Sequence, residues 1–308
     1  MKIIFMGTPD FAVPTLEMLN EKHEVLAVFT QPDRPKGRGQ KLQMSPVKET
    51  ALKYDIPVYQ PAKLKGDKES LQIIKDISPD AIVVVAFGQI LPKDILDIPK
   101  YGCINVHASL LPELRGAAPI NWAIIRGYKY TGITTMKMDV GLDTGDMLLK
   151  ETVEIGENET AGELHDRLMG IGAELLIKTL EMLENNMIVP EKQDDSKSSY
   201  APMLNKELGH IDWNNDSYNV YNLIRGVIPW PGAYFFYDDK MIKIWEAIKI
   251  EDICDIPGKI LDVNQEGIKI ACKKGAIIIK ELQEIGGKRM DVLSYINGHE
   301  IEKGKIVK

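Results

Sequence analysis

Cysteine is scarce in this sequence. The 308 residues contain three, Cys103, Cys254 and Cys272, and no two of them stand at the two-residue spacing that metal sites and redox-active pairs use. The pattern therefore argues against a cysteine-based metal or redox site. It fits a reducing compartment, and we expect a cytoplasmic location.

The sequence also lacks a long hydrophobic run and an excess of positive charge. Its apolar start is interrupted at Gly7 and Pro9, too early for a signal peptide or a membrane-spanning helix, so we expect a buried first strand and no membrane partner. The net charge of −7 excludes a protein that coats nucleic acid through bulk positive charge. Any contact with RNA has to depend on local patches.

The composition that remains, 44% hydrophobic and 27% charged, is ordinary for a globular protein long enough for two cores. From Lys2 to about Glu184, short apolar runs alternate with segments of helical period. This alternation predicts an α/β domain with a doubly wound, mostly parallel, Rossmann-like sheet. The expected strands are 2–6, 25–30, 81–86, 104–107 and 132–138, and a helix over 160–184, opened by a capping box at Thr160 and Glu163, follows them.

After this helix the pattern changes. We expect a first domain over 1–189, a polar linker over 190–208 and a second domain over 209–308. The second domain has one helical segment, 218–225, followed by short β-like runs. Five such strands predict a small β-barrel of the oligonucleotide-binding (OB) kind, with strands at 233–237, 241–247, 259–263, 267–271 and 276–282.

The chemistry is expected where polar residues follow a strand, because ligands of open α/β sheets bind at the carboxyl ends of the strands. Asn105 and His107 stand two apart at the end of one expected strand, so their side chains share a face. An amide and an imidazole placed together can stabilise an oxygen that becomes negative and move a proton. The segment Ala86 to Gln89 follows a neighbouring strand in the same way.

A loop rich in carboxylates and glycines, Asp139 to Asp146, follows another expected strand. We expect it to bring Asp143 against His107, where the carboxylate stabilises the charged imidazole or orders a water. The acidic residues do not have EF-hand spacing, so a calcium loop is disfavoured and no metal is expected. Cys103, within an apolar run, is interpreted as core.

These residues carry a resemblance to a known family. The pattern Asn105-x-His107-x-Ser109-Leu110-Leu111-Pro112, followed by Asp143, is similar to the signature of folate-dependent formyltransferases. The segments that extend the similarity over nearly the whole chain, toward the members that act on methionyl-tRNA, are 7–11, 31–35, 37–39, 211–213 and 229–231.

The resemblance implies transfer of the formyl group of 10-formyltetrahydrofolate to the α-amine of initiator methionyl-tRNA, for translation initiation. Asn105 would stabilise the oxyanion of a tetrahedral intermediate, His107 would assist proton transfer, and Asp143 would tune His107. No metal is implied, and we expect a monomer. The folate is expected on the segment Ser109, Leu110, Leu111 and Pro112, and against the loop residues Phe87, Gly88 and Leu91.

A basic stretch between Gln31 and Lys41 stands out in an acidic chain. It has four basic side chains, Arg34, Lys36, Arg38 and Lys41, against Asp33. Its prolines and glycines make a helix or a strand unexpected, and charge alone favours a solvated loop. The resemblance implies instead that it binds the tRNA.

Two other functions stay open. A formyltransferase with a different amine acceptor, such as an amino-sugar nucleotide or glycinamide ribonucleotide, would have the same first domain. A nucleotide-binding oxidoreductase, or a binding module without catalysis, would have a similar α/β scaffold. The turn Gly7 to Phe11 argues against the oxidoreductase, because it lacks the three-glycine fingerprint of dinucleotide sites.

Overall fold

The computed structural model describes residues 1–36 and 41–308. Contacts divide the chain into two units, and each is described by itself. Unit 1 comprises 1–116, 131–154 and 165–201, and unit 2 comprises 117–130, 155–164 and 202–308. Two stretches that precede residue 189 thus group with the second unit, and residues 190–201 group with the first.

Unit 1 contains a seven-stranded sheet in the order β10-β9-β7-β6-β1-β2-β5. The strands from β5 to β7 are parallel, and β9 runs antiparallel to β7. Their bounds are β1 Lys2–Gly7, β2 Glu24–Phe29, β5 Val58–Tyr59, β6 Ala81–Val85, β7 Cys103–His107, β9 Tyr130–Lys137 and β10 Met147–Glu154. The predicted doubly wound, mostly parallel sheet is confirmed.

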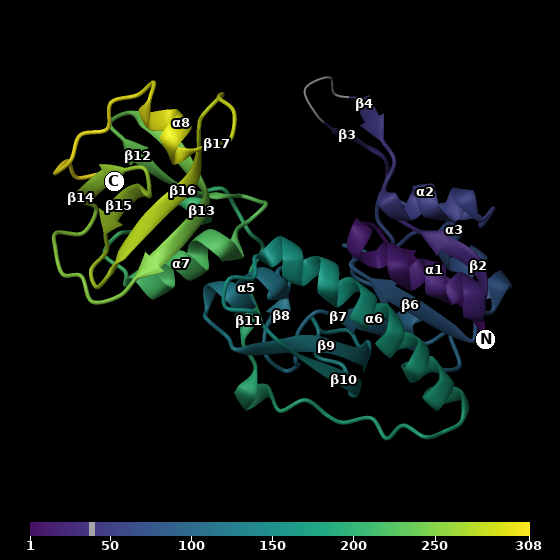
Figure 1. Cartoon of the computed structure of the whole chain (residues 1–308). Coiled ribbons are helices and arrows are strands. Elements are labelled where there is room, and N and C mark those ends of the chain that lie inside the picture. Colours follow the sequence, from purple (N-terminus) through teal and green to yellow (C-terminus); the bar gives the residue numbers. More distant parts are fainter. Residues whose placement is uncertain (37–40) are drawn as a thin grey trace. The chain divides into compact units, whose positions relative to one another are not determined.

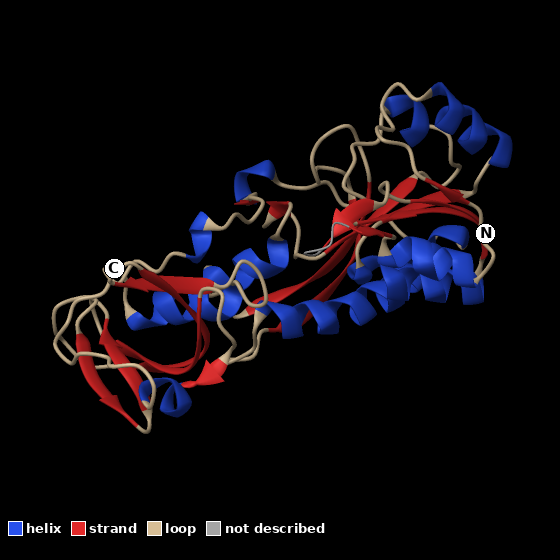
Figure 2. Cartoon of the chain, turned by 90° about the horizontal axis from the view of Figure 1, so that it is seen from above, coloured by secondary structure: helices blue, strands red, loops and turns tan. Residues whose placement is uncertain are grey.

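Helices lie on both faces of this sheet (Figure 2), which is why β6 and β7 are buried along their whole length. The helices are η1 Asp10–Ala12, α1 Val13–Lys22, α2 Pro46–Lys53, α3 Lys68–Ile77, α4 Lys93–Leu96 and α6 Ala161–Glu184. The predicted capping box opens α6: Glu163 accepts from the Thr160 amide at 2.8 Å, and Thr160 Oγ1 accepts from the Glu163 amide at 3.3 Å. In residues 1–36 and 41–308, no helix is both long and apolar enough to cross a bilayer.

The prediction that the basic stretch forms no strand is wrong. Residues Arg34–Lys36 form β3 and pair with Lys41–Gln43, which form β4, although prolines and glycines made a strand unexpected here. A two-stranded ribbon tolerates Pro35 because only alternate residues donate to its single ladder. Arg38 lies outside the described residues. We call the segment from β3 to β4 the arm (Figure 1).

Unit 2 is built on an antiparallel sheet in the order β12-β13-β16-β15-β14, with the short β17 on β16. The predicted small β domain is confirmed, and β12 and β15 have the predicted bounds. Its core includes Trp213, which lies edge-on to Phe235. The elements are α5 Pro119–Ile125, η3 Glu207–Gly209, α7 Ser217–Gly226, β12 Ala233–Tyr237, β13 Lys240–Ile250, β14 Ile260–Asn264, β15 Gly267–Ala271, β16 Ala276–Glu284, β17 Met290–Asp291 and α8 Val292–Ile296.

Candidate active site

Strand β7 places Asn105 and His107 on one face at its carboxyl end, where they are 9% and 6% exposed. His107 lies opposite Thr134 of β9, and Asn105 lies opposite Met136. Within residues 1–36 and 41–308, the Asn105 carboxamide has no hydrogen-bond partner. A buried strand therefore holds an amide donor that is free to bind a ligand oxygen.

The orientation of His107 is fixed by a backbone carbonyl. Its Nε2 lies 3.0 Å from the Leu114 oxygen. A carbonyl oxygen only accepts, so Nε2 carries the proton and Nδ1 is the nitrogen that gains or loses one. Nδ1 is 3.8 Å from Asp143 Oδ2. This distance is too long for a direct hydrogen bond, and it places the carboxylate within ion-pair range of the ring.

Asp143 comes from the loop between β9 and β10, where it has a φ of 53°. Its Oδ2 accepts from the Gly116 amide at 2.8 Å. Glycine is required at 145, because a Cβ there would lie 1.9 Å from the Lys137 oxygen. The Asp139 carboxylate binds the loop's own groups, Gly141 N and Thr144 Oγ1. The loop thus presents Asp143, of its carboxylates, to the imidazole.

The segment Ser109 to Pro112 is held by a hydrogen bond to the next residue, Glu113, and by two hydrogen bonds with Thr134 of β9. Ser109 Oγ donates to the Glu113 oxygen at 2.6 Å. Thr134 Oγ1 donates to the Ser109 oxygen at 2.7 Å and accepts from the Leu111 amide at 3.1 Å. Leu111 is buried with Met136 and Met147, whereas Leu110 and Pro112 are half-buried.

The loop after β6 turns two of its predicted folate residues inward. Phe87 and Leu91 are each 2% exposed in the core beneath the sheet. Ala86 and Gly88, both with positive φ, are exposed. The Phe87 carbonyl accepts from Thr8 Oγ1 and Gln31 Nε2. The loop therefore presents the backbone of residues 86 and 88 outward, rather than the two apolar side chains.

Of the predicted tRNA-binding residues, Arg34 is exposed on β3, and its guanidinium lies 3.5 Å from Gln31 Oε1. Lys36 and Lys41 lie opposite each other in the backbone pairing of β3 with β4. The base of the arm is held by Asp33 Oδ2, which accepts from Lys48 Nζ at 2.7 Å.

Sequence reasoning missed the groups that orient the catalytic candidates: the Leu114 carbonyl, the Gly116 amide, Thr134 and Gln193. Leu114 and Gly116 stand directly after the recognised motif, but a backbone group leaves no sequence signal. Gln193 lies in the polar run that was interpreted as linker. The Nε2 of its side chain donates to the backbone carbonyl oxygen of Asp143, 50 residues away.

Cys103 is not a nucleophile candidate. Burial raises the pKa of its thiol to about 12, so the thiolate is not formed near neutral pH. The interpretation of Cys103 as core is confirmed by its position in the cluster beneath the sheet.

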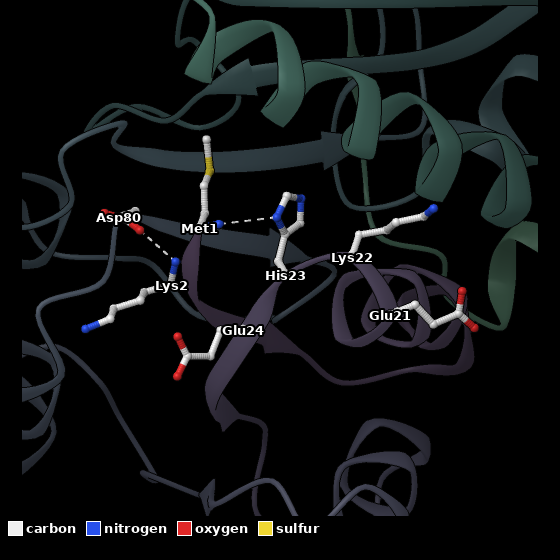
Figure 3. A pocket seen from close by; sticks show the side chains of 7 residues that line it. All are labelled: Met1, Lys2, Glu21, Lys22, His23, Glu24 and Asp80. Carbon is white, nitrogen blue, oxygen red and sulfur yellow. Dashed lines mark hydrogen bonds between the residues drawn. The ribbon is translucent and has the colours of Figure 1, made fainter.

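A shallow pocket lies at the opposite edge of the sheet (Figure 3). It is lined by residues at the amino ends of β1, β2 and β6, including Lys2, Glu24 and Asp80. Polar groups there already pair with each other, since the Lys2 amide donates to Asp80 Oδ2 at 2.6 Å. Ligands of such sheets bind at the carboxyl ends, so this pocket is separate from the site.

The similarity of this chain to known proteins identifies its family. Residues 1–180 match the family model described as formyl transferase, and residues 203–300 match that of the formyl transferase C-terminal domain. The chain belongs to the formyltransferase family. The resemblance inferred from the motif around Asn105 and His107 is thereby confirmed, and the protein is a transferase.

Relatives of this formyltransferase match it over its full length. The methionyl-tRNA formyltransferase of Clostridium botulinum (strain Alaska E43 / Type E3) is 60% identical, covering 100% of this chain and 99% of that protein. The methionyl-tRNA formyltransferase of Clostridium perfringens (strain 13 / Type A) is 57% identical, covering 100% of both.

Solved structures share the fold of this formyltransferase. An N-formyltransferase from Helicobacter canadensis, in complex with folinic acid and dTDP-3-aminofucose, has a TM-score of 0.68 at 22% identity, over 91% of this chain and 98% of that one. HypX from Aquifex aeolicus, in complex with tetrahydrofolic acid, has a TM-score of 0.65 at 17% identity, over 100% of this chain and 50% of that one.

Proposed function

We propose that this formyltransferase transfers the formyl group of 10-formyltetrahydrofolate to the α-amine of initiator methionyl-tRNA. The observation that carries the proposal is the full-length identity of 57–60% to bacterial proteins named for this reaction. The folate derivatives in two solved structures of the same fold support a reduced folate as formyl donor. The Helicobacter structure carries no argument for an amino-sugar acceptor here, because 22% identity supports the fold alone.

Asn105 has the position and the free amide that an oxyanion donor needs. When the amine attacks the formyl carbon, the new N–C bond pushes an electron pair onto the formyl oxygen. Asn105 donates a hydrogen bond to that oxygen, which is typically worth about 3 kcal/mol in the transition state. Because no other described group uses the amide, the donor need not be released first.

His107 accepts the proton, and Asp143 supports it. The attacking nitrogen loses a proton to His107 Nδ1, the nitrogen that the Leu114 carbonyl leaves free. The Asp143 carboxylate, 3.8 Å away, stabilises the resulting imidazolium. Collapse of the intermediate breaks the bond from carbon to N10 of the folate, and N10 takes up a proton. No covalent intermediate with the protein is required.

The two substrates are assigned to different parts of unit 1. We propose that the folate lies along Ser109 to Pro112 and the loop Phe87 to Leu91, where the exposed backbone at 86 and 88 can pair with the polar edge of the pterin. The arm, with Arg34, Lys36, Arg38 and Lys41, would contact the phosphates of the tRNA. We further propose a monomeric, cytoplasmic enzyme.

The test is a formyl-transfer assay with two acceptors. The protein is incubated with 10-formyltetrahydrofolate and either charged initiator methionyl-tRNA or an amino-sugar nucleotide. We expect formylmethionyl-tRNA and no formylated sugar. Formylation of the sugar nucleotide alone would reject the proposed acceptor and leave the assignment to the family untouched.

A further inference from the structure

Three consecutive residues of unit 1 hold both members of the proposed proton-transfer pair. The Leu114 carbonyl contacts His107 Nε2, and the Gly116 amide donates to the Asp143 carboxylate. This segment is itself held by a later part of the chain. The Leu114 amide donates to Ser199 Oγ at 2.9 Å, and the Arg115 amide donates to the Ser199 oxygen at 2.9 Å.

Arg115, which lies between Leu114 and Gly116, connects this segment to Gln193 through its side chain. Arg115 Nε and Nη2 donate to Gln193 Oε1 at 3.0 and 2.8 Å. Gln193 Nε2 then donates to the carbonyl oxygens of Asp143 and Gly145, at 2.7 and 2.8 Å. We call the Gln193 carboxamide and these four hydrogen bonds the Gln193 bridge.

The Gln193 bridge has a defined polarity. Arginine has donors and no acceptor, so it fixes the oxygen of the carboxamide toward itself and turns the NH2 group toward the two carbonyls. The loop needs such support because Asp143 is a non-glycine residue with φ of 53°, a region that costs free energy. Outside this network, Arg115 Nη2 also donates to Asp195, whose side chain is 82% exposed.

We propose that Gln193 is a positioning residue for Asp143: through its two hydrogen bonds to the loop backbone it keeps the carboxylate against His107. The proposal rests on the proposed role of Asp143. It predicts a loss in the chemical step without a loss of substrate binding, because neither substrate is assigned to Gln193.

The experiment compares three single variants of the full-length enzyme in the formyl-transfer assay. Gln193→Met keeps the length of the side chain and removes all four hydrogen bonds. We expect kcat to fall roughly 10- to 100-fold, the scale of a misplaced catalytic group, with KM for both substrates within about twofold. The matched control is Asp195→Ala, which removes the exposed contact of Arg115 and should leave kcat unchanged.

Gln193→Glu is a second variant at the same position, for the case that Gln193→Met does not fold. A carboxylate still accepts from Arg115 but opposes the carbonyls of Asp143 and Gly145, so the same loss of kcat is expected with a melting temperature within about 2 °C of the parent. A normal kcat in either variant at position 193 overturns the proposal, as does a rise in KM as large as the fall in kcat.

A double-mutant cycle separates this inference from the proposed function. If Gln193 acts through Asp143, adding Gln193→Met to Asp143→Asn lowers kcat by less than about twofold further. A full additional loss contradicts the inference. If Asp143→Asn alone keeps normal turnover, the proposed role of Asp143 fails instead.

Discussion

At the scale of the residue, the role proposed for Asn105 depends on its sequence motif and on its place at the end of β7. Its motif predicted an oxyanion donor, and the fold supplies a nearly buried amide without a partner among the described residues. Roles for His107 and Asp143 were also predicted from the sequence and stay predictions, but which nitrogen of His107 faces Asp143 could not be predicted. That depends on the Leu114 carbonyl, which every residue type possesses.

Removal of the Asn105 amide should affect turnover rather than folding. We expect Asn105→Ala to lower kcat by about 100- to 1000-fold, since one oxyanion donor contributes about 3 kcal/mol. Steady-state kinetics with both substrates measure this, with circular dichroism as the check on folding. Asn185→Ala is the control, because Asn185 is exposed and its amide donates only to the Glu181 oxygen. Equal kcat in the two variants would remove Asn105 from the mechanism.

The three thiols should differ sharply in reactivity. Burial raises the pKa of Cys103 and of Cys272 to about 12, whereas Cys254 is exposed. Titration with a disulfide reagent at pH 8 should therefore modify one thiol in the native protein and three in denaturant. Because the folded-state pKa of both buried thiols is raised, stability from keeping them protonated is present below about pH 8.5 and is lost toward pH 12. Fast reaction of two thiols at pH 8 would contradict the burial.

At the scale of the element, the strands that were found from sequence are those buried on both faces. The apolar runs of β1, β6 and β7 leave no ambiguity. β10 was missed because it is an edge strand whose middle, Lys150 to Thr152, is charged or polar and exposed. The arm was misjudged because pairing across a two-stranded ribbon is not visible in local propensity.

The loop between β9 and β10 should not tolerate a side chain at position 145. Gly145→Ala would place Cβ 1.9 Å from the Lys137 oxygen, so the loop must shift and carry Asp143 away from His107. We expect at least a tenfold lower kcat, on the scale of a misplaced group. Gly170→Ala in α6 is the control, because a Cβ at this position would have no atom within 4 Å. This variant should stabilise the protein by up to about 1 kcal/mol and leave kcat unchanged. Wild-type turnover of the Gly145 variant would show that the loop is not a precise support.

The arm should contribute to the binding of tRNA and not to the binding of the folate. Arg38→Ala is expected to raise KM for methionyl-tRNA several-fold and to leave KM for the folate unchanged, because a lost phosphate contact weakens tRNA binding without touching the folate segment. Lys53→Ala, which removes an equal charge from the exposed end of α2, is the matched control. If both variants behave alike, the arm has no specific contact.

At the scale of the whole molecule, the chain is interleaved, and this could not be predicted. Residues 155–164, which include the start of α6, belong with the C-terminal sheet by contact, although most of α6 belongs to unit 1. The buried Arg225 explains the grouping, because its Nη1 donates to the oxygens of Gly156 and Glu159 at 3.1 and 2.9 Å. An arginine in a helix gives no sign of partners more than 60 residues away. The boundaries at 189 and 209 stay a prediction.

Arg225 should therefore stabilise unit 2. Arg225→Met removes these two hydrogen bonds and leaves the buried Asn222 Oδ1 without its donor. We expect a loss of roughly 2 kcal/mol in the free energy of unfolding. Urea titration followed by tryptophan fluorescence reports on this unit specifically, because Trp122, Trp213, Trp230 and Trp245 all lie within it. Arg289→Met, at an exposed ion pair with Glu281, is the control and should change stability by less than about 1 kcal/mol. Equal effects would mean that burial of Arg225 adds nothing.

The hydrogen bond between Ser199 and Leu114, 85 residues apart, has a consequence for synthesis on the ribosome. A nascent chain that has emerged only as far as residue 190 already contains the side chains proposed for the chemistry. It does not yet contain Gln193 or Ser199, which support the loop and the segment around them. We therefore expect catalytic competence to arise late in translation, when the strand β11, Tyr200–Ala201, pairs with β8, Arg115–Gly116.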